Sequence, residues 1–132
     1  MAILYKLRQD NRRTSRHKGC WFAHAVNSGT VDTDMLARII ERNCSLKRSD
    51  VLAVLAELSD AMRDLLLSSH RVRLDGIGSF MPGLNVKAAK TPDDFQQDRD
   101  ITDIHLCFIP EKTNHNGICR NTLLDGYELS EF

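Results

Sequence analysis

The feature that most constrains the fold is a long apolar pattern between about Arg48 and Ser69. Six apolar residues follow the 3.6-residue period of a helix: Val51, Leu55, Leu58, Met62, Leu65 and Leu66. Five more widen the stripe well beyond one face: Leu52, Val54, Ala56, Ala61 and Leu67. A helix that is apolar around most of its circumference must be covered on most sides. Because the chain offers only one other convincing helix, the sequence predicts a homodimer in which the long helix packs on its symmetry mate.

Length and composition indicate one ordinary globular domain. The chain has 132 residues, of which 42% are hydrophobic and 27% are charged. These values exclude a disordered charged tail, a collagen and a low-complexity scaffold. No apolar run approaches the roughly 20 residues that span a bilayer, and the apolar stretch at the N-terminus is too short for a signal peptide. We therefore expect a cytoplasmic protein that does not bind membranes and whose cysteines remain thiols.

The charged residues are unevenly distributed along the chain. Residues 1–30 carry a net charge of +5, residues 31–70 carry −2, residues 71–100 carry 0 and residues 101–132 carry −3. A basic N-terminal segment fits an anionic partner. The alternative is a solvated loop whose charge only maintains solubility.

Local patterns predict two helices and two strands of an N-terminal hairpin. Residues 2–9 and 20–26 have the alternation or composition of strands, and the basic residues between them form the hairpin's long tip. Residues 33–43 are expected to be a helix, because polar side chains at residues 30–33 can cap it. After a short break, the long apolar helix follows.

The second half of the chain predicts strands separated by irregular segments. Residues 71–80 begin as a strand and bend at the two glycines, and residues 103–110 return as a strand. Residues 81–100 lose the apolar rhythm, which predicts a protruding, mobile segment. Residues 111–122 are interpreted as a polar loop, and residues 123–132 as either a short strand or a frayed end.

No catalytic signature is present, and the candidate metal ligands are weak. Gly76-Ile77-Gly78 joins two predicted strands, so it does not indicate a nucleotide site. Three pairs have spacings that metal ligands use: Cys20 with His24, His105 with Cys107, and His115 with Cys119. They lie in distant segments, and chance spacing explains them equally well. We expect no cofactor, no metal and no enzymatic activity, and we interpret Cys44 and Cys107 as small core residues.

Three short motifs accompany this order of predicted elements: residues 46–51 (LKRSDV) before the long helix, residues 72–80 (VRLDGIGSF) around the two glycines, and residues 108–110 (FIP) at the end of the last predicted strand. Together with the order of elements, they resemble the HU and integration-host-factor family of bacterial histone-like DNA-binding proteins. The first resembles the entry to the family's second helix, the second is close to its V-x-L-x-G-F-G-x-F, and the third resembles its F-x-P. The resemblance covers about residues 31–110. Residues 1–30 resemble the extra strands of an extended HU-like subfamily.

The resemblance implies an α+β fold in which two helices pack on a small antiparallel sheet with a protruding β-arm, and two chains intertwine. We accordingly divide the chain into an N-terminal β-hairpin extension (1–30), an HU-like DNA-binding domain (31–110) and an acidic C-terminal tail (111–132). The implied function is sequence-tolerant binding of double-stranded DNA through the minor groove and phosphates, with bending or compaction in the nucleoid and no small-molecule substrate. A protein-interaction module on the same fold, with weakened DNA binding, is the alternative.

The implied DNA-binding arm covers about Met81–Ile101, with Pro92 at the position of the apolar wedge. The cations of this arm are Lys87, Lys90 and Arg99. The same stretch holds four acidic residues, Asp93, Asp94, Asp98 and Asp100, so the arm has a net charge of −1. Because an arm that enters a groove should be positive, the alternative is a loop of another purpose in which Pro92 is an ordinary turn residue.

Three other groups of cations are candidates for phosphate contacts. Arg71 and Arg73 face outward on their strand, where they either contact phosphate or only add solubility. Lys47 and Arg48 precede or begin the long helix, whose N-terminus favours an anion. In the N-terminal loop, we hypothesise that four cations replace the missing charge of the arm: Arg12, Arg13, Arg16 and Lys18.

Overall fold

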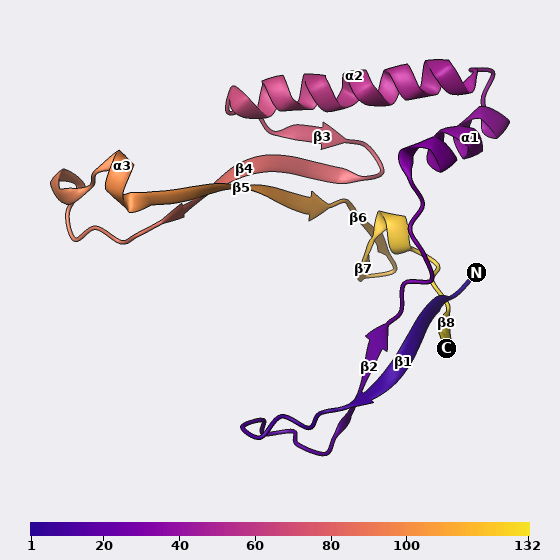
Figure 1. The fold of residues 1–132 in the computed structure, drawn as a ribbon, viewed down its shortest axis with the longest axis horizontal. Coiled ribbons are helices and arrows are strands. Elements are labelled where there is room, and N and C mark those ends of the chain that lie inside the picture. The colour runs from indigo at the N-terminus through magenta and orange to yellow at the C-terminus, as the bar shows by residue number, and fades with distance from the viewer.

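The two predicted helices form one layer of the molecule. In the computed structural model, which describes residues 1–132, they are α1 (Thr33–Asn43) and α2 (Arg48–Leu67) (Figure 1). Asp32 caps α1 by accepting a 2.8 Å hydrogen bond from the backbone N–H of Met35. The backbone N–H of Arg48 donates to Glu41 Oε1 at 3.0 Å, which ties the start of α2 to α1. The helix predictions are confirmed, although α2 ends two residues earlier than expected. None of the helices has the length and hydropathy of a membrane span.

A three-stranded antiparallel sheet lies under α2. Its strands are β3 (Val72–Leu74), β4 (Gly78–Val86) and β5 (Ile101–Pro110), in the order β3-β4-β5. Gly76 has φ 80° and Gly78 has φ 149°, which confirms the predicted bend. A Cβ on Gly78 would lie 2.3 Å from the carbonyl oxygen of Ile109, so this position requires glycine for space as well as for conformation.

Strands β4 and β5 continue past the end of α2 as an arm (Figure 1). Their pairing extends to Val86 opposite Ile101, so the expected irregular segment at 81–100 is a strand as far as residue 86. The tip contains a 3₁₀ turn (Pro92–Asp94) and a short helix, α3 (Gln97–Asp100). This stretch therefore protrudes as predicted (Figure 1), and most of it has regular secondary structure.

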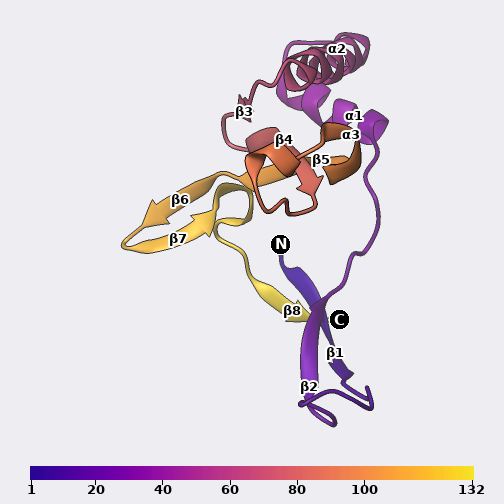
Figure 2. The same ribbon diagram turned by 90° about the vertical axis from the view of Figure 1, so that its left-hand side faces the viewer.

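The N-terminal extension and the end of the chain share a second sheet. It has the order β2-β1-β8 and consists of β1 (Ile3–Gln9), β2 (Trp21–Ala25) and β8 (Leu129–Glu131). The predicted hairpin is confirmed as the antiparallel pair β1–β2, and β8 runs parallel to β1 (Figures 1 and 2). Of the two interpretations of residues 123–132, the short strand is correct.

Residues 111–122 form a hairpin, so their interpretation as a polar loop was wrong. Strand β6 (Lys112–His115) pairs antiparallel with β7 (Ile118–Asn121). The turn between them holds Asn116 at φ 52° and Gly117 at φ 82°. An Asn-Gly pair with two positive φ angles is the usual two-residue connection of a hairpin, and this signal was present in the sequence.

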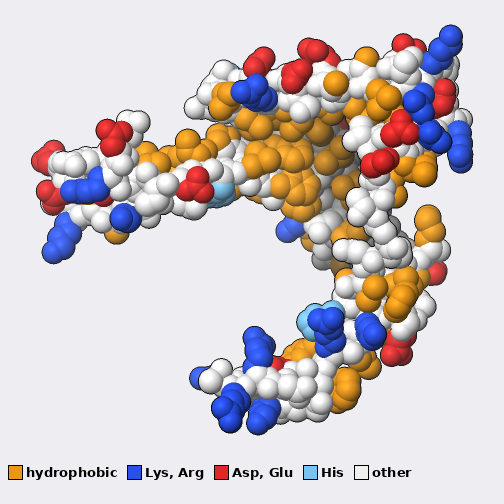
Figure 3. Space-filling view, viewed as in Figure 1, with side chains coloured by type: hydrophobic (Ala, Val, Ile, Leu, Met, Phe, Trp, Pro, Cys, Tyr) orange, Lys and Arg blue, Asp and Glu red, His pale blue; other side chains and the backbone are white.

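A single chain encloses very little core. Only 5 of 132 residues are buried, and the apolar ones are Ala37 and Val51. Phe80 and Phe108 stack with ring centroids 4.8 Å apart, yet Phe108 remains 45% exposed. Much of the apolar surface between the helices and the arm is open in Figure 3. All four cysteines are free; Cys107 is half-buried, whereas Cys44 is exposed, so its interpretation as a core residue was wrong.

Candidate nucleic-acid interface

The loop between β1 and β2 is held in shape by one carboxylate. Asp10 accepts hydrogen bonds from the backbone N–H of Arg12 at 3.0 Å, from Arg12 Nε at 3.1 Å and from Ser15 Oγ at 2.5 Å. These donors lower the pKa of Asp10 far below its usual value and raise the pKa of Arg12. The backbone of Asp10 also bonds to both Gly19 and Cys20, which closes the loop at its base.

This closed loop presents three cations that have no acidic partner. Arg13, Arg16 and Lys18 are exposed and form no ion pair. Figure 3 shows the basic side chains gathered at the end of the hairpin. The fourth predicted cation, Arg12, has a structural role through Asp10 while its side chain stays 81% exposed. The predicted group of four is therefore brought together, with three members free to meet an anion.

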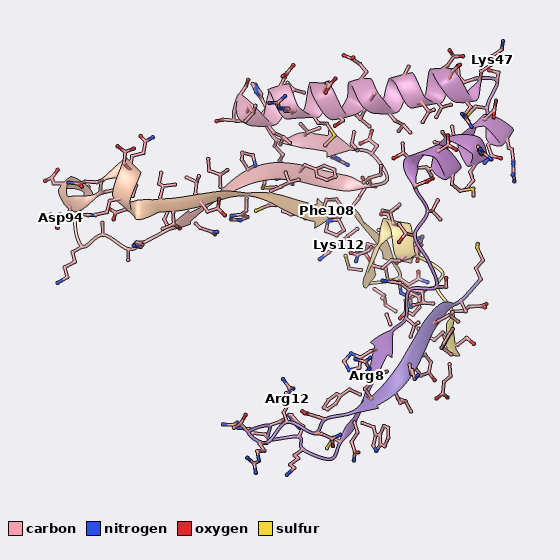
Figure 4. All side chains as sticks on the ribbon, in the orientation of Figure 1. Arg8, Arg12, Lys47, Asp94, Phe108 and Lys112 are labelled. Carbon is pink, nitrogen blue, oxygen red and sulfur yellow. The ribbon has the colours of Figure 1, made fainter.

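One face of the hairpin extends this basic surface. Arg8 pairs with Phe22 and Lys6 pairs with His24 across the two strands, so these four side chains share a face. Arg8 and His24 also line a shallow pocket beside Arg12, and Figure 4 shows Arg8 and Arg12 on the same hairpin. The candidate residues taken from the sequence omitted Lys6, Arg8 and His24, although the period-2 alternation of residues 2–9 indicated that Lys6 and Arg8 share a face.

Arg73 lies within β3 and Arg71 immediately precedes it, and the two arginines differ in their partners. Arg73 Nη2 lies 3.1 Å from Glu111 Oε1, and Arg73 Nε lies 3.5 Å from Asp75 Oδ1. The other oxygen of Glu111 accepts a 2.7 Å hydrogen bond from the backbone N–H of Gly76. Arg71 has no ion pair and lines the same shallow pocket as Arg73 and Ser79. Of the two predicted phosphate contacts, Arg71 is free and Arg73 is held by acids.

The cations at the start of α2 lie apart from the hairpin. Arg48 Nη1 lies 3.3 Å from Asp34 Oδ1, so its charge is balanced within the helical layer. Lys47 is exposed, and Figure 4 places it at the opposite end of the molecule from Arg12. One chain therefore does not gather all the predicted cations on a single continuous surface.

The tip of the arm is internally paired and locally acidic. Arg99 Nε lies 2.8 Å from Asp100 Oδ1, and Arg99 Nη2 donates to the carbonyl oxygen of Asp94 at 2.7 Å. This pairing raises the pKa of Arg99 and, together with the backbone N–H of Gln96, lowers the pKa of Asp100 to about 2. Arg99 is thus not free to meet phosphate. Lys87 and Lys90 are exposed without ion pairs, but so are three acids of the tip: Asp93, Asp94 and Asp98.

Pro92 is the first residue of a 3₁₀ turn. The turn is closed by hydrogen bonds from Asp94 to Thr91 and from Phe95 to Pro92. This is a position that proline's fixed φ suits. The geometry therefore accounts for Pro92 as a turn residue without any contact to DNA.

The predicted cysteine and histidine pairs do not converge on a metal site. No group of three His, Cys, Asp or Glu side chains lies close enough to hold an ion. His105 and Cys107 both lie over Gly83, where a Cβ would come within 2.6 Å of His105 Nε2 and 2.8 Å of Cys107 Sγ. Gly83 thus provides the space in which these two side chains pack.

The chain is similar to a known protein family and to a solved structure. A family profile described as an HU domain fused to wHTH, Ig, or glycine-rich motif matches residues 1–123. A crystal structure from Bacteroides vulgatus ATCC 8482, described as a "putative bacterial DNA binding protein", has a TM-score of 0.65 at 9% sequence identity. The alignment covers 98% of this chain and 48% of that one, so the chain spans about half the length of the structure it matches. No curated protein matches the chain.

Proposed function

The chain belongs to the family of HU domains fused to wHTH, Ig or glycine-rich motifs, and we propose that it binds double-stranded DNA with little sequence preference and bends or compacts it. The observation that carries this proposal is the closed hairpin loop with three unpaired cations, Arg13, Arg16 and Lys18. Cations on a loop of fixed shape neutralise phosphates without the entropy cost of ordering a flexible segment. Because phosphate contacts carry no sequence information, binding through them is sequence-tolerant.

The active unit in this proposal is a homodimer. Along α2, Val54 is 59% exposed, Leu58 36% and Leu65 45%, and on the arm Leu106 is 60% exposed. Exposed apolar side chains on neighbouring elements mark an interaction surface. A second copy that covers these residues completes the core that a single chain lacks, and it doubles each group of cations on the assembly.

The candidate residues divide into free and internally paired cations. We assign phosphate contact to Arg13, Arg16, Lys18 and Arg71, supported on the hairpin face by Arg8. Three exposed lysines are secondary candidates: Lys47, Lys87 and Lys90. The two on the arm rank lower than the loop cations because the arm also carries four acidic residues. Four arginines are paired with carboxylates, so we assign them structural roles first: Arg12, Arg48, Arg73 and Arg99. Binding thus depends on the hairpin more than on the arm or on Pro92.

The test is fluorescence anisotropy of the full chain with short intact and nicked duplexes across a salt series. We expect log K to fall linearly with log salt, because each phosphate contact releases counterions. Tighter binding to the nicked duplex would show that the protein reads deformability, as bending requires. The absence of binding at low salt would contradict the proposal and favour a protein-interaction module, to which the exposed acids of the arm tip are suited.

A further inference from the structure

Strand β2 has an open edge. It pairs only with β1, because the sheet has the order β2-β1-β8. The backbone N–H of Asp10 donates to the carbonyl oxygen of Cys20, and the backbone N–H of Val26 donates to the carbonyl oxygen of Leu4. The backbone groups of Cys20 and Val26, on either side of β2, therefore face β1. Since hydrogen-bonding direction alternates along a strand, residues 22 and 24 also face β1. The N–H and C=O groups of Trp21, Ala23 and Ala25 therefore point away from the sheet.

The side chains beside this edge do not protect it. Natural edge strands are blunted by charges, proline or bulges, whereas β2 reads WFAHA and contains no Lys, Arg, Asp, Glu or Pro. Trp21 is 62% exposed on one face and Phe22 is 41% exposed on the other. Ala23 and Ala25 also line an entirely apolar trough with Ile3, Tyr5 and Leu129. The edge thus combines unpaired backbone groups with uncovered aromatic and apolar surface.

We propose that β2 pairs antiparallel with β2 of a second copy of this chain, across a two-fold axis at Ala23. In this register Ala23 faces Ala23, Trp21 faces Ala25, and Phe22 faces His24 of the other copy. Each large side chain is placed opposite a small or planar one, and no two like charges are directly opposite. Every outward-facing N–H of the strand then meets an outward-facing carbonyl of the other copy.

The pattern of the strand favours this register over its neighbours. A shift by one residue would place outward-facing groups opposite inward-facing ones, which breaks the ladder. A shift by two leaves either Ala25 or Trp21 beyond the end of the other strand. Only the register centred on Ala23 pairs all five residues of β2 about a two-fold axis, with Trp21 opposite the small side chain of Ala25. This complete pairing is the reason we assign the edge to a second copy and not to an unrelated peptide.

The edge interface does not involve the helices. It is formed by the N-terminal sheet, whereas the homodimer proposed above covers α2 and the arm (Figure 1). Two different two-fold interfaces on one chain join dimers into longer assemblies. Assembly through β2 is therefore independent of DNA contact, so β2 pairing and DNA binding can be tested separately.

Site-specific cysteines test the register. In a variant with the four native cysteines replaced by serine, Ala23→Cys places two thiols opposite each other, at a Cα separation of about 5.5 Å that a disulfide can bridge. His24→Cys is the matched control, because its nearest copy is a diagonal neighbour about 7–8 Å away. After mild oxidation of the full chain, we expect Ala23→Cys to form covalent dimers at least fivefold more efficiently than His24→Cys. Equal cross-linking of the two variants, or none, would overturn the proposal.

A proline substitution tests the assembly itself. Ala23→Pro removes an outward-facing N–H and leaves the β1–β2 hydrogen bonds intact, which an edge strand tolerates; Ala23→Thr retains the N–H as a control. Sedimentation velocity over a concentration series should show species larger than the dimer for the natural chain and Ala23→Thr, but not for Ala23→Pro. Identical distributions for natural and proline variants would contradict pairing through β2. Anisotropy with DNA on the same samples shows separately whether DNA binding persists.

Discussion

Arg99 and Asp100 form the tightest ion pair of the molecule, with Nε 2.8 Å from Oδ1, and the side chain of Asp100 is only 5% exposed. The pair closes the tip of the arm, because Asp100 Oδ2 also accepts from the backbone N–H of Gln96. A cation held in this way stabilises the tip and adds little to the attraction of phosphate. The arm of this chain therefore has a different electrostatic character from a basic, DNA-inserting arm.

Removal of this ion pair should loosen the tip and leave DNA affinity nearly unchanged. We expect Arg99→Ala to increase amide hydrogen exchange at residues 94–100 at least tenfold, because Asp94 and Asp100 both lose a donor. Anisotropy should show less than a twofold change in DNA affinity. A loss of affinity as large as that of Arg16→Ala would contradict the structural role assigned to Arg99.

The order of the tip should also depend on pH in a defined direction. The pKa of Asp100 is lowered from 3.8 to about 2, so the folded tip favours the ionised carboxylate. Its contribution is fully present above about pH 4 and is lost as the pH falls through 2. An NMR titration of the Asp100 carboxyl carbon should give a midpoint near 2, whereas in Arg99→Ala the midpoint should return toward 3.8. An unchanged midpoint in the variant would show that Arg99 is not the cause.

Gly78 should be the least replaceable glycine of the chain. An added Cβ would lie 2.3 Å from the carbonyl oxygen of Ile109 and 2.8 Å from Phe108, and its φ of 149° is unfavourable for other residues. We expect Gly78→Ala to lower the free energy of unfolding by about 2 kcal/mol or more, measured by urea denaturation. Gly29→Ala is the control, because its Cβ would meet nothing within 4 Å. Equal effects of the two would contradict this close approach.

The helices and the N-terminal hairpin could be predicted because their signals are local. The cap at Asp32, the apolar period of α2 and the alternation of residues 3–9 each lie within one element. The hairpin at residues 112–121 was equally predictable from Asn116-Gly117. The parallel pairing of β1 with β8 was not, because it joins Ile3 to Leu129 across the whole chain and β8 has only three residues.

The location of the candidate site could be predicted from the sequence, but the pairing of its cations could not. The sequence identified the basic loop, because its four cations lie close together, between Arg12 and Lys18. It did not reveal which cations are neutralised. Arg73 is paired with Glu111, 38 positions away, and the pairing of Arg99 depends on how the tip folds back on Asp94. The distinction between free and paired cations is a property of the tertiary structure, and it changes which residues are assigned to DNA.

The exposed face of α2 should be required for dimerisation. Leu58 and Leu65 are apolar, 36% and 45% exposed, and about two helical turns apart. We expect the double variant Leu58→Asp and Leu65→Asp to be monomeric, or unfolded where no monomer is stable, because buried unpaired carboxylates are strongly unfavourable. Light scattering and circular dichroism measure the two outcomes. The control is Asp60→Asn, at an exposed position of the same helix, and a folded dimer of the double variant would contradict the proposed interface.

The salt dependence of binding should identify the hairpin cations directly. Each phosphate contact contributes about 0.9 to the slope of log K against log salt, so Arg13→Ala with Arg16→Ala should reduce the slope by about 1.8 per chain engaged. The matched control is Arg42→Ala with Arg63→Ala, which removes the same charge from exposed positions on α1 and α2. A general effect of net charge would weaken both double variants alike. If only the loop variant loses slope while its circular dichroism is unchanged, the loop contacts phosphate; equal slopes in all three proteins would assign DNA contact to another surface.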